Sequence, residues 1–149
     1  MGKKNYIQGV YEPLNKKKYK GSHPIIYRSS LEKKAFFMLD TNKKITQWGS
    51  ESVVVPYISP IDSRMHRYFV DINFKFTDST GKTIKYLVEI KPFKQTLRPV
   101  KTPRKRQKTF LTESCMWAVN QAKWEAADNW AKKNGYIFKI ITEKDMKLS

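Results

Sequence analysis

The chain has 149 residues and a formal net charge of +17, from 30 lysines and arginines against 13 acidic residues. This length suits one domain with a sizeable core, and a hydrophobic content of 40% is that of a globular chain rather than a disordered one. So large a positive charge favours a polyanionic partner. Nucleic acid fits better than a membrane, because no segment joins basic residues to a long apolar helical face. The alternative is a merely basic surface.

Two further features narrow the class of protein. Cys115 is the only cysteine, which excludes a disulfide framework and a cysteine zinc cluster. The longest apolar run, at residues 53–58, is far too short to span a bilayer. We therefore expect no membrane partner.

Residues 1–24 are polar and basic, with little periodicity. We interpret them as a basic N-terminal arm, or a loosely packed lead-in, to a domain formed by residues 25–149. Such an arm would suit a phosphate backbone, and a solvated tail is an equally good interpretation.

A helix is predicted to begin after Ser29, because Glu32 follows this N-cap candidate at the spacing of a capping box. The helix is expected to stop at residues 40–42. Glu32 has two interpretations, a partner of the cap or an additional acid of a functional site, and the local sequence favours the cap. The buried stripe is expected to contain Leu31, Ala35, Met38 and Leu39.

Three strands are predicted next, as an antiparallel meander. The β-branched run at residues 53–55 predicts a buried strand, and alternation predicts strands over residues 68–76 and 86–90. A turn signal at residues 78–81 joins the last two strands. Residues paired across such a loop have numbers that sum to roughly 159 or 160. Asp71 is therefore expected beside Glu89.

Asp71, Glu89 and Lys91 share the phase of these strands that is opposite to the apolar residues. Two carboxylates and an ammonium on one patch of sheet suit a hard divalent cation, which carboxylate oxygens prefer to hold. Asp71 and Glu89 would bind the ion together with the backbone carbonyl of Ile90. Such an ion can promote the hydrolysis of a phosphodiester by activating a water molecule. In that reaction Lys91 would orient the attacking water or neutralise the charge on the phosphate. The alternative is an exposed cross-strand salt bridge, which would stabilise little.

A basic, proline-rich stretch follows the third strand. From Lys91 to Lys108 there are eight basic residues, three prolines and no acid. Prolines keep a chain extended, so we expect a loop that grips phosphates, although a charge run is usually only a solvated surface. The residues assigned to nucleic-acid contact are Arg28, Lys33, Lys94, Gln95, Lys101, Arg104, Lys105, Arg106, Gln121 and Lys123.

The remaining sequence predicts a long helix and a last strand. The helix is expected over residues 112–133, with Thr112 as its cap and Gly135 as its stop, and the strand over residues 136–141. Trp117 and Trp124 are interpreted as packing residues rather than base-stacking ones. The core stripe of the helix is expected to contain Cys115, Val119, Ala122, Ala126 and Trp130.

The order of helix, three strands, helix and strand, with Glu32, Asp71 and Glu89-Ile90-Lys91 at its polar positions, resembles the PD-(D/E)xK nuclease core. Val70 stands where that motif has proline, which leaves the acid itself undisturbed. The chain is more similar still to the head-completion nucleases of T-even-like tailed phages, and more distantly similar to the TnsA-type transposon endonucleases. Residues 27–32, 55–60, 66–69, 89–92 and 120–124 carry the similarity.

The resemblance implies an α/β (α+β) fold of the restriction-endonuclease type, with residues 25–149 as the nuclease domain. It implies DNA cleavage that depends on Mg²⁺, with Mn²⁺ as a substitute, in the cytoplasm of an infected host cell. The cleavage would help to finish a packaged phage head, in contact with head or neck proteins and with association with the virion as a further option. The resemblance also favours Glu32 as an active-site acid and Gln121 as a helix-borne site residue.

Two rival functions remain open on the sequence. One is a non-catalytic protein that binds DNA or caps its end on an inherited nuclease fold. The other is a ribosomal-type RNA-binding protein. The latter explains the charge but not the in-phase acids, since bare carboxylates repel a phosphate backbone unless a cation lies between them.

Overall fold

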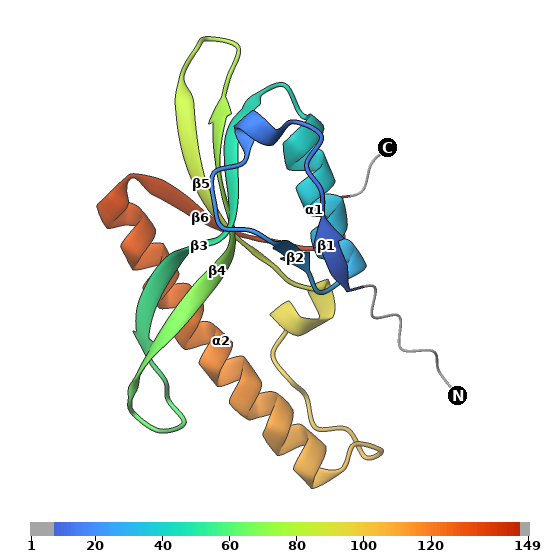
Figure 1. Cartoon of the computed structure of the whole chain (residues 1–149). Helices are drawn as coiled ribbons and strands as arrows, with labels where there is room; N and C mark the ends of the chain where they lie inside the picture. The colour runs from blue at the N-terminus through green and yellow to red at the C-terminus, as the bar shows by residue number, and fades with distance from the viewer. Residues whose placement is uncertain (1–7, 147–149) are drawn as a thin grey trace.

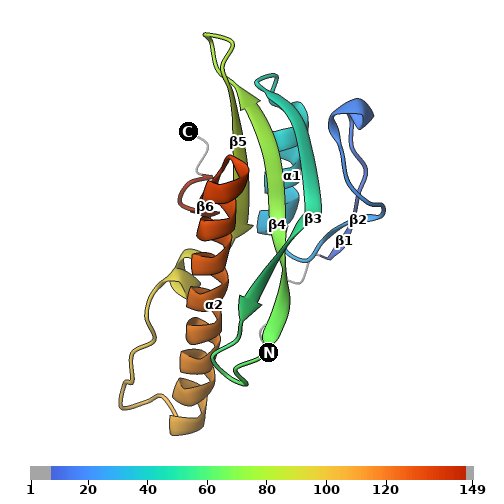
Figure 2. The same ribbon diagram turned by 90° about the vertical axis from the view of Figure 1, so that its left-hand side faces the viewer.

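The computed structural model describes residues 8–146 of the chain, in three layers. A four-stranded sheet lies in the middle, with α1 and the N-terminal segment on one face and α2 on the other (Figures 1 and 2). No helix within residues 8–146 is long and apolar enough to cross a membrane. The elements are β1 (Gly9–Tyr11), η1 (Lys16–Lys18), β2 (Ile25–Tyr27), α1 (Ser30–Thr41), β3 (Ile45–Ile58), β4 (Met65–Thr77), β5 (Thr83–Ile90), η2 (Phe93–Thr96), α2 (Gln107–Asn134) and β6 (Tyr136–Ile141).

The large sheet has the strand order β3-β4-β5-β6, with the first three strands antiparallel and β6 parallel to β5. Parallel neighbours need a long crossover, and α2 supplies it. The predicted fold class is therefore confirmed, including the bounds of the last strand. Gly135 caps α2 with a φ of 76°, the left-handed conformation that glycine adopts without strain.

Both faces of the sheet are buried, in two separate hydrophobic clusters. The cluster under α1 contains Phe36 and Trp48, and the cluster under α2 contains Leu87 and Trp124. The alternating apolar residues of β4 are divided between the two. Tyr68 and Val70 belong to the α2 side, whereas Ile72, Phe74 and Phe76 belong to the α1 side. The division falls at Asp71, where β3 also shifts its register against β4.

The start of α1 is confirmed, because the side chain of Ser29 caps it and accepts a hydrogen bond from the Glu32 N–H at 3.1 Å. Phe36, which the predicted stripe does not include, is 1% exposed.

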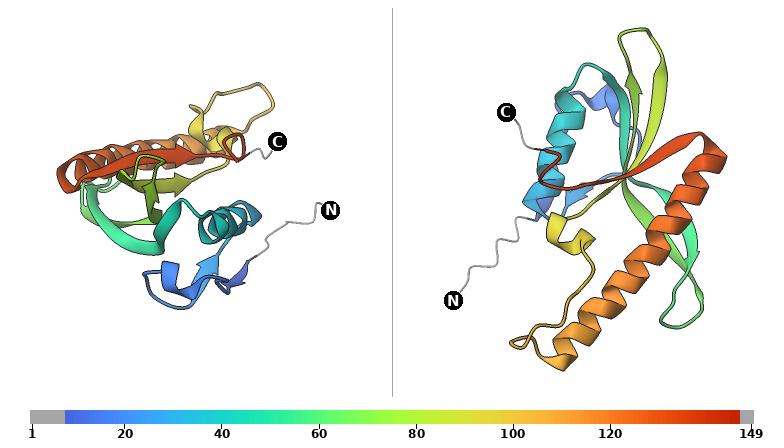
Figure 3. Two further views of the ribbon diagram at one scale, coloured as in Figure 1. Left: turned by 90° about the horizontal axis from the view of Figure 1, so that it is seen from above. Right: turned by 180° about the vertical axis from the view of Figure 1, so that it is seen from behind.

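The start of α2 differs from the prediction, whereas four of the five predicted stripe residues pack partly buried against the α2-side cluster: Val119, Ala122, Ala126 and Trp130. The helix begins at Gln107, and Thr112 lies inside it, where its hydroxyl donates to the Lys108 carbonyl at 3.0 Å. Cys115 is exposed, because the N-terminal half of α2 runs past the sheet beside the loop at residues 97–106 (Figure 3). Trp124 is buried, which confirms its packing role, and the other buried positions are Ala127 and Ala131.

The predicted N-terminal arm is instead part of the folded domain, as far as residues 8–24 are concerned; residues 1–7 lie outside the described residues. β1 pairs with β2, and Tyr11 and Tyr19 are buried in the α1-side cluster. The boundary placed at residue 24 thus separates no independent unit. The sequence did not reveal this packing because its anchor is a distant residue, Asp40.

Asp40 is 0% exposed and joins the N-terminal segment to the end of α1. Its carboxylate accepts hydrogen bonds from the Tyr11 hydroxyl at 2.7 Å and from the N–H groups of Leu14 and Asn15 at 2.7 and 3.0 Å. Burial alone would raise the pKa of Asp40, but these bonds and the nearby Lys18 ammonium lower it overall. The Asp40 carboxylate is therefore kept in its charged form inside the fold.

Replacing Asp40 with alanine is expected to lower the free energy of unfolding by about 3–5 kcal/mol, because the buried Tyr11 hydroxyl and two part-buried N–H groups lose their acceptor. The matched control is Asp128→Ala, which removes only an exposed ion pair with Lys132 and should cost less than about 1 kcal/mol. Urea unfolding followed by circular dichroism measures both. Equal losses in the two variants would contradict the anchoring role.

Candidate active site

Asp71 lies where the pairing of β4 with β5 ends. The last paired residues are Ile72 and Val88, whose numbers sum to 160, so the count predicted for this hairpin is confirmed. One residue further on, Asp71 Oδ2 accepts the backbone N–H of Ile90 at 2.7 Å. A carboxylate thus takes the place that a backbone carbonyl of β4 would fill in a continued ladder.

Across β4, the strand β3 carries a bulge opposite Asp71. Ser50 pairs with Ile72 and Val53 pairs with Val70, so Glu51 and Ser52 together oppose the single residue Asp71. Sequence reasoning missed this feature. The available signal was the small polar run at residues 49–52, which interrupts an otherwise apolar strand.

Glu89 and Lys91 lie together on β5 and just beyond it. The Lys91 Nζ is 3.7 Å from Glu89 Oε1, so the two side chains share a face as predicted. That face is not open sheet, because α2 covers it and leaves Glu89 only 6% exposed. The second oxygen, Oε2, is buried with no hydrogen-bond partner among the described residues.

Burial perturbs both acids. It raises the pKa of Asp71 to about 7, with a contribution from the Glu32 and Glu51 charges and in opposition to the Ile90 N–H and Lys91. Burial likewise raises the pKa of Glu89 to about 7, and the ammoniums of Lys91 and Lys123 oppose it. Acids held in this way are stabilised by any cation that enters the site.

Glu32 has the geometry of a cap and lies near the acids as well. Its Oε2 accepts the Arg28 N–H at 3.0 Å and the Ser29 hydroxyl at 3.1 Å. Its charge contributes to raising the pKa values of Asp71 and Glu89. Within residues 8–146, however, no three His, Cys, Asp or Glu side chains gather closely enough to hold a metal ion. A ligand role for Glu32 stays a prediction.

The donors at the end of β5 fit a hard divalent cation that keeps much of its water. Asp71 and Glu89 offer carboxylate oxygens, one of them buried and unpartnered in the described part of the chain. The N–H and C=O of a residue in a strand point to the same side, so the Ile90 carbonyl faces Asp71 as its N–H does. Two carboxylates with water as the remaining ligands is a usual set for Mg²⁺.

A cavity of about 610 Å³ lies next to Ile90 and Lys91, between the start of α1, the end of β5 and η2. Its lining includes Glu32, Lys34, Lys91, Gln95 and Glu143. Of the residues predicted to contact DNA, Gln95 therefore lines the same cavity as Lys91 and Glu32.

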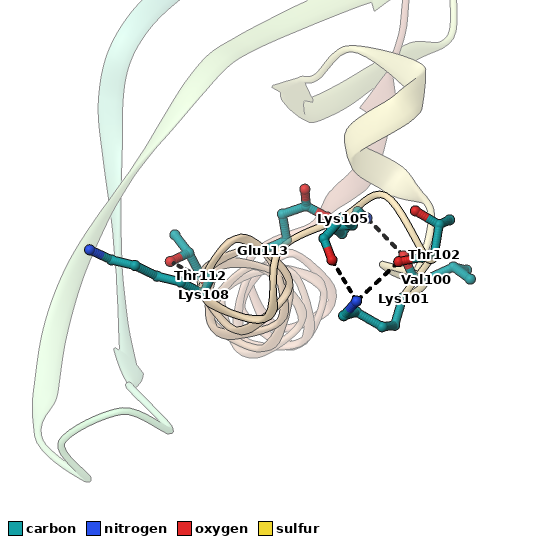
Figure 4. A network of polar contacts seen from close by, with 7 residues as sticks. All are labelled: Val100, Lys101, Thr102, Lys105, Lys108, Thr112 and Glu113. Carbon is teal, nitrogen blue, oxygen red and sulfur yellow. Dashed lines mark hydrogen bonds and ion pairs between the residues drawn. The ribbon is translucent and has the colours of Figure 1, made fainter.

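The basic loop before α2 is folded onto itself. The Lys105 Nζ donates to the Val100 carbonyl and to Glu113 Oε2, both at 2.8 Å, and the Lys101 Nζ donates to the carbonyls of Thr102 and Lys105 (Figure 4). Two of the predicted phosphate contacts, Lys101 and Lys105, thus use their ammonium groups in hydrogen bonds within the loop and to α2. Besides Lys101, the predicted contacts that are exposed are Arg28, Lys33, Lys94, Gln95, Arg104, Arg106 and Gln121.

On α2, Lys123 rather than Gln121 faces the acids. Gln121 is exposed, whereas the Lys123 ammonium lies 5.8 and 5.4 Å from the ring centroids of Tyr57 and Tyr68. Its charge also lowers the pKa of Glu89, which places it near that carboxylate.

A sheet covered by helices on both faces, with two acids and a lysine at the break of its central hairpin, defines the class: a nuclease domain of the restriction-endonuclease type. Comparison with known proteins agrees. The family described as TnsA-like endonuclease N terminal matches residues 42–143, which include Asp71, Glu89 and Lys91. The head completion nuclease of Enterobacteria phage T4 is 41% identical over 143 residues, 93% of each chain. The chain belongs to the TnsA-like endonuclease family. No solved structure matches it.

Glu89→Gln is expected to stabilise the metal-free protein at pH 8 but not at pH 4. A carboxyl whose pKa rises on folding favours the folded state while it is protonated, and this stability is lost as pH rises from the unfolded value through the folded one. The shift from 4.5 to about 7 corresponds to at most about 3 kcal/mol. Urea unfolding across this pH range measures it. The exposed Glu125→Gln is the control. If the free energy of unfolding changed with pH in the same way in both variants, the burial of Glu89 would not be the cause of the pH dependence.

Proposed function

We propose that the protein is a metal-dependent DNA endonuclease that acts in phage head completion. The observation that carries the proposal is the Asp71 carboxylate at the end of the β4–β5 ladder, beside the Glu89–Lys91 pair. Family membership supports the nuclease activity, and the printed name of the T4 relative supports the biological role.

Asp71, Glu89 and the Ile90 carbonyl would hold the cation, for which Mg²⁺ is the natural choice and Mn²⁺ a substitute. Glu32 would complete the acidic surroundings. When bound, the cation supplies Lewis-acid stabilisation of the phosphate and a lower pKa for a nucleophilic water.

The chain's own groups supply the rest. Lys91 has its ammonium 3.7 Å from Glu89, where it can hold a water in line or neutralise the charge that grows on the phosphate. The Ile90 N–H keeps the Asp71 carboxylate in one orientation. Cover from α2 excludes bulk water around Glu89, which strengthens these electrostatic interactions.

DNA would be held mainly through its phosphates. The net charge of +17 favours binding to a polyanion without sequence readout. Exposed basic residues lie at the start of α1, in η2 and in the loop before α2, among them Lys33, Lys94 and Arg104.

A catalytic role explains the acids better than a DNA-capping role does. A protein that only binds DNA has no use for two carboxylates whose burial disfavours their charged form. Perturbed acids of this kind are typical of functional sites. We place the activity in the infected host cell, with phage head proteins as neighbours, on the strength of the T4 relative.

Asp71→Asn is expected to reduce plasmid nicking in Mg²⁺ or Mn²⁺ at least about a hundredfold, because the cation loses a charged ligand. The same substitution should abolish the Mn²⁺-induced rise in melting temperature of the protein. Asp128→Asn, on the exposed side of α2, should change neither readout. Equal nicking by wild type and Asp71→Asn would sink the assignment. Salt-sensitive DNA binding without metal-dependent cleavage by wild type would instead support the capping function.

Arg104→Gln should weaken DNA binding and reduce the slope of log Kd against log salt by about 1, the loss of one phosphate contact. Lys105→Met also removes one positive charge, but the ammonium that it removes bonds to the Val100 carbonyl and to Glu113. We therefore expect it to lower the melting temperature and leave the slope unchanged. Fluorescence anisotropy at several salt concentrations separates the two, and equal slopes would contradict the division of roles.

A further inference from the structure

The backbone of Glu51 adopts a conformation that its side chain disfavours. Its φ is 51°, in the left-handed region that residues other than glycine, asparagine and aspartate rarely occupy. Glu51 sits in the β3 bulge that opposes Asp71. Strained positions of this kind persist only where their surroundings hold them, and they gather at functional sites.

The bulge is held by close packing. A Cβ added to Gly49 would lie 2.6 Å from the Lys20 carbonyl oxygen and 2.6 Å from Ser52 Oγ, so only glycine fits there. The Ser52 hydroxyl donates to Asn73 Oδ1 on β4 at 2.7 Å. The N-terminal segment and β4 thus clamp the bulge from both sides, and the strain at Glu51 is built into the fold.

The carboxylate of Glu51 contacts Arg28. Glu51 Oε1 lies 2.6 Å from Arg28 Nη1, with side chains that are 38% and 51% exposed. An ion pair this exposed contributes little to stability. Stability therefore does not account for the strained backbone that makes the pair.

Arg28 is held at a second point as well. Its backbone N–H donates to Glu32 Oε2 at 3.0 Å, and the charges of both Glu32 and Glu51 contribute to raising the pKa of Asp71. The guanidinium is thus bound to the bulge residue that opposes Asp71, and Glu51 sets its direction. A guanidinium has five N–H donors in a fixed fork, and Glu51 engages only Nη1. Donors remain for a phosphate.

We propose that Glu51 is a positioning residue, which holds the Arg28 guanidinium at the bulge opposite Asp71 so that it meets a DNA phosphate in one orientation. This role rests on the proposed nuclease function. It assigns the β3 bulge a purpose: the extra residue turns an acid toward the start of α1. An acid placed by a regular strand at this position would point to the other side of the sheet.

The kinetic test is a double-mutant cycle on metal-dependent cleavage that requires Asp71. Glu51→Gln keeps the side-chain shape and removes the charge, and we expect it to lower kcat about tenfold with KM nearly unchanged. Arg28→Ala should lower kcat by at least as much. In the Arg28→Ala background, Glu51→Gln should have no further effect, because the residue acts through Arg28. Glu125→Gln serves as the control for removal of one acid.

Glu51→Gly gives a readout that a merely structural residue would not produce. Glycine adopts a positive φ without strain, so this variant should melt at a higher temperature than Glu51→Gln while it loses the same activity. The expected result is a melting temperature above that of Glu51→Gln together with a kcat below that of the wild type. A lower melting temperature for Glu51→Gly would contradict the strain and the proposal with it.

The remaining outcomes are also decisive. Wild-type kcat for Glu51→Gln, or effects of Glu51→Gln and Arg28→Ala that add, would overturn the positioning role and leave the nuclease assignment intact. A loss of the Mn²⁺-induced melting shift in Glu51→Gln would make Glu51 a cation ligand instead. Wild-type protein without Asp71-dependent cleavage would overturn the proposed function, and this role with it.

Discussion

The hydrogen bond from the Ile90 N–H to Asp71 Oδ2 is the interaction on which the site depends. It ends the antiparallel ladder after Ile72 and Val88, because a side chain rather than a backbone carbonyl receives the next donor. β5 then continues beside β6 alone and carries Glu89 under α2. This arrangement disfavours the charged forms of Asp71 and Glu89, since burial raises both pKa values to about 7. A cation bound between them would offset that cost, which is the physical link between the fold and the proposed activity.

The surroundings of this hydrogen bond are supported from the edge of the sheet. β3 is an edge strand, and the N-terminal segment covers part of it through a 2.8 Å bond from the Lys20 N–H to the Trp48 carbonyl. Asp40 fixes the same segment to the end of α1. An uncovered edge would invite pairing with other chains, and it would leave the bulge at Glu51 without its clamp. Residues far from the acids thus hold the site's geometry.

Much of this arrangement follows from local rules that the sequence carries openly. The turn at residues 78–81 sets the register of Asp71 against Glu89, Ser29 caps α1, and Gly135 ends α2. The rest depends on tertiary contacts. The N-terminal segment packs because Asp40 receives it, and α2 starts early because Lys105 and Glu113 tie its preceding loop to its first turns. The bulge breaks the strand's period without glycine at the strained position, so periodicity alone does not locate it.

The central claim is that Asp71 and Glu89 share a divalent cation at the end of the β4–β5 ladder. Crystals soaked in Mn²⁺ test it most directly, because anomalous scattering locates the metal independently of activity. The expected result is one strong peak within bonding distance of both carboxylates, at about 2.0–2.2 Å for a hard divalent ion of this size. Ordered Asp71 and Glu89 side chains without an anomalous peak between them, at high Mn²⁺, would contradict the claim.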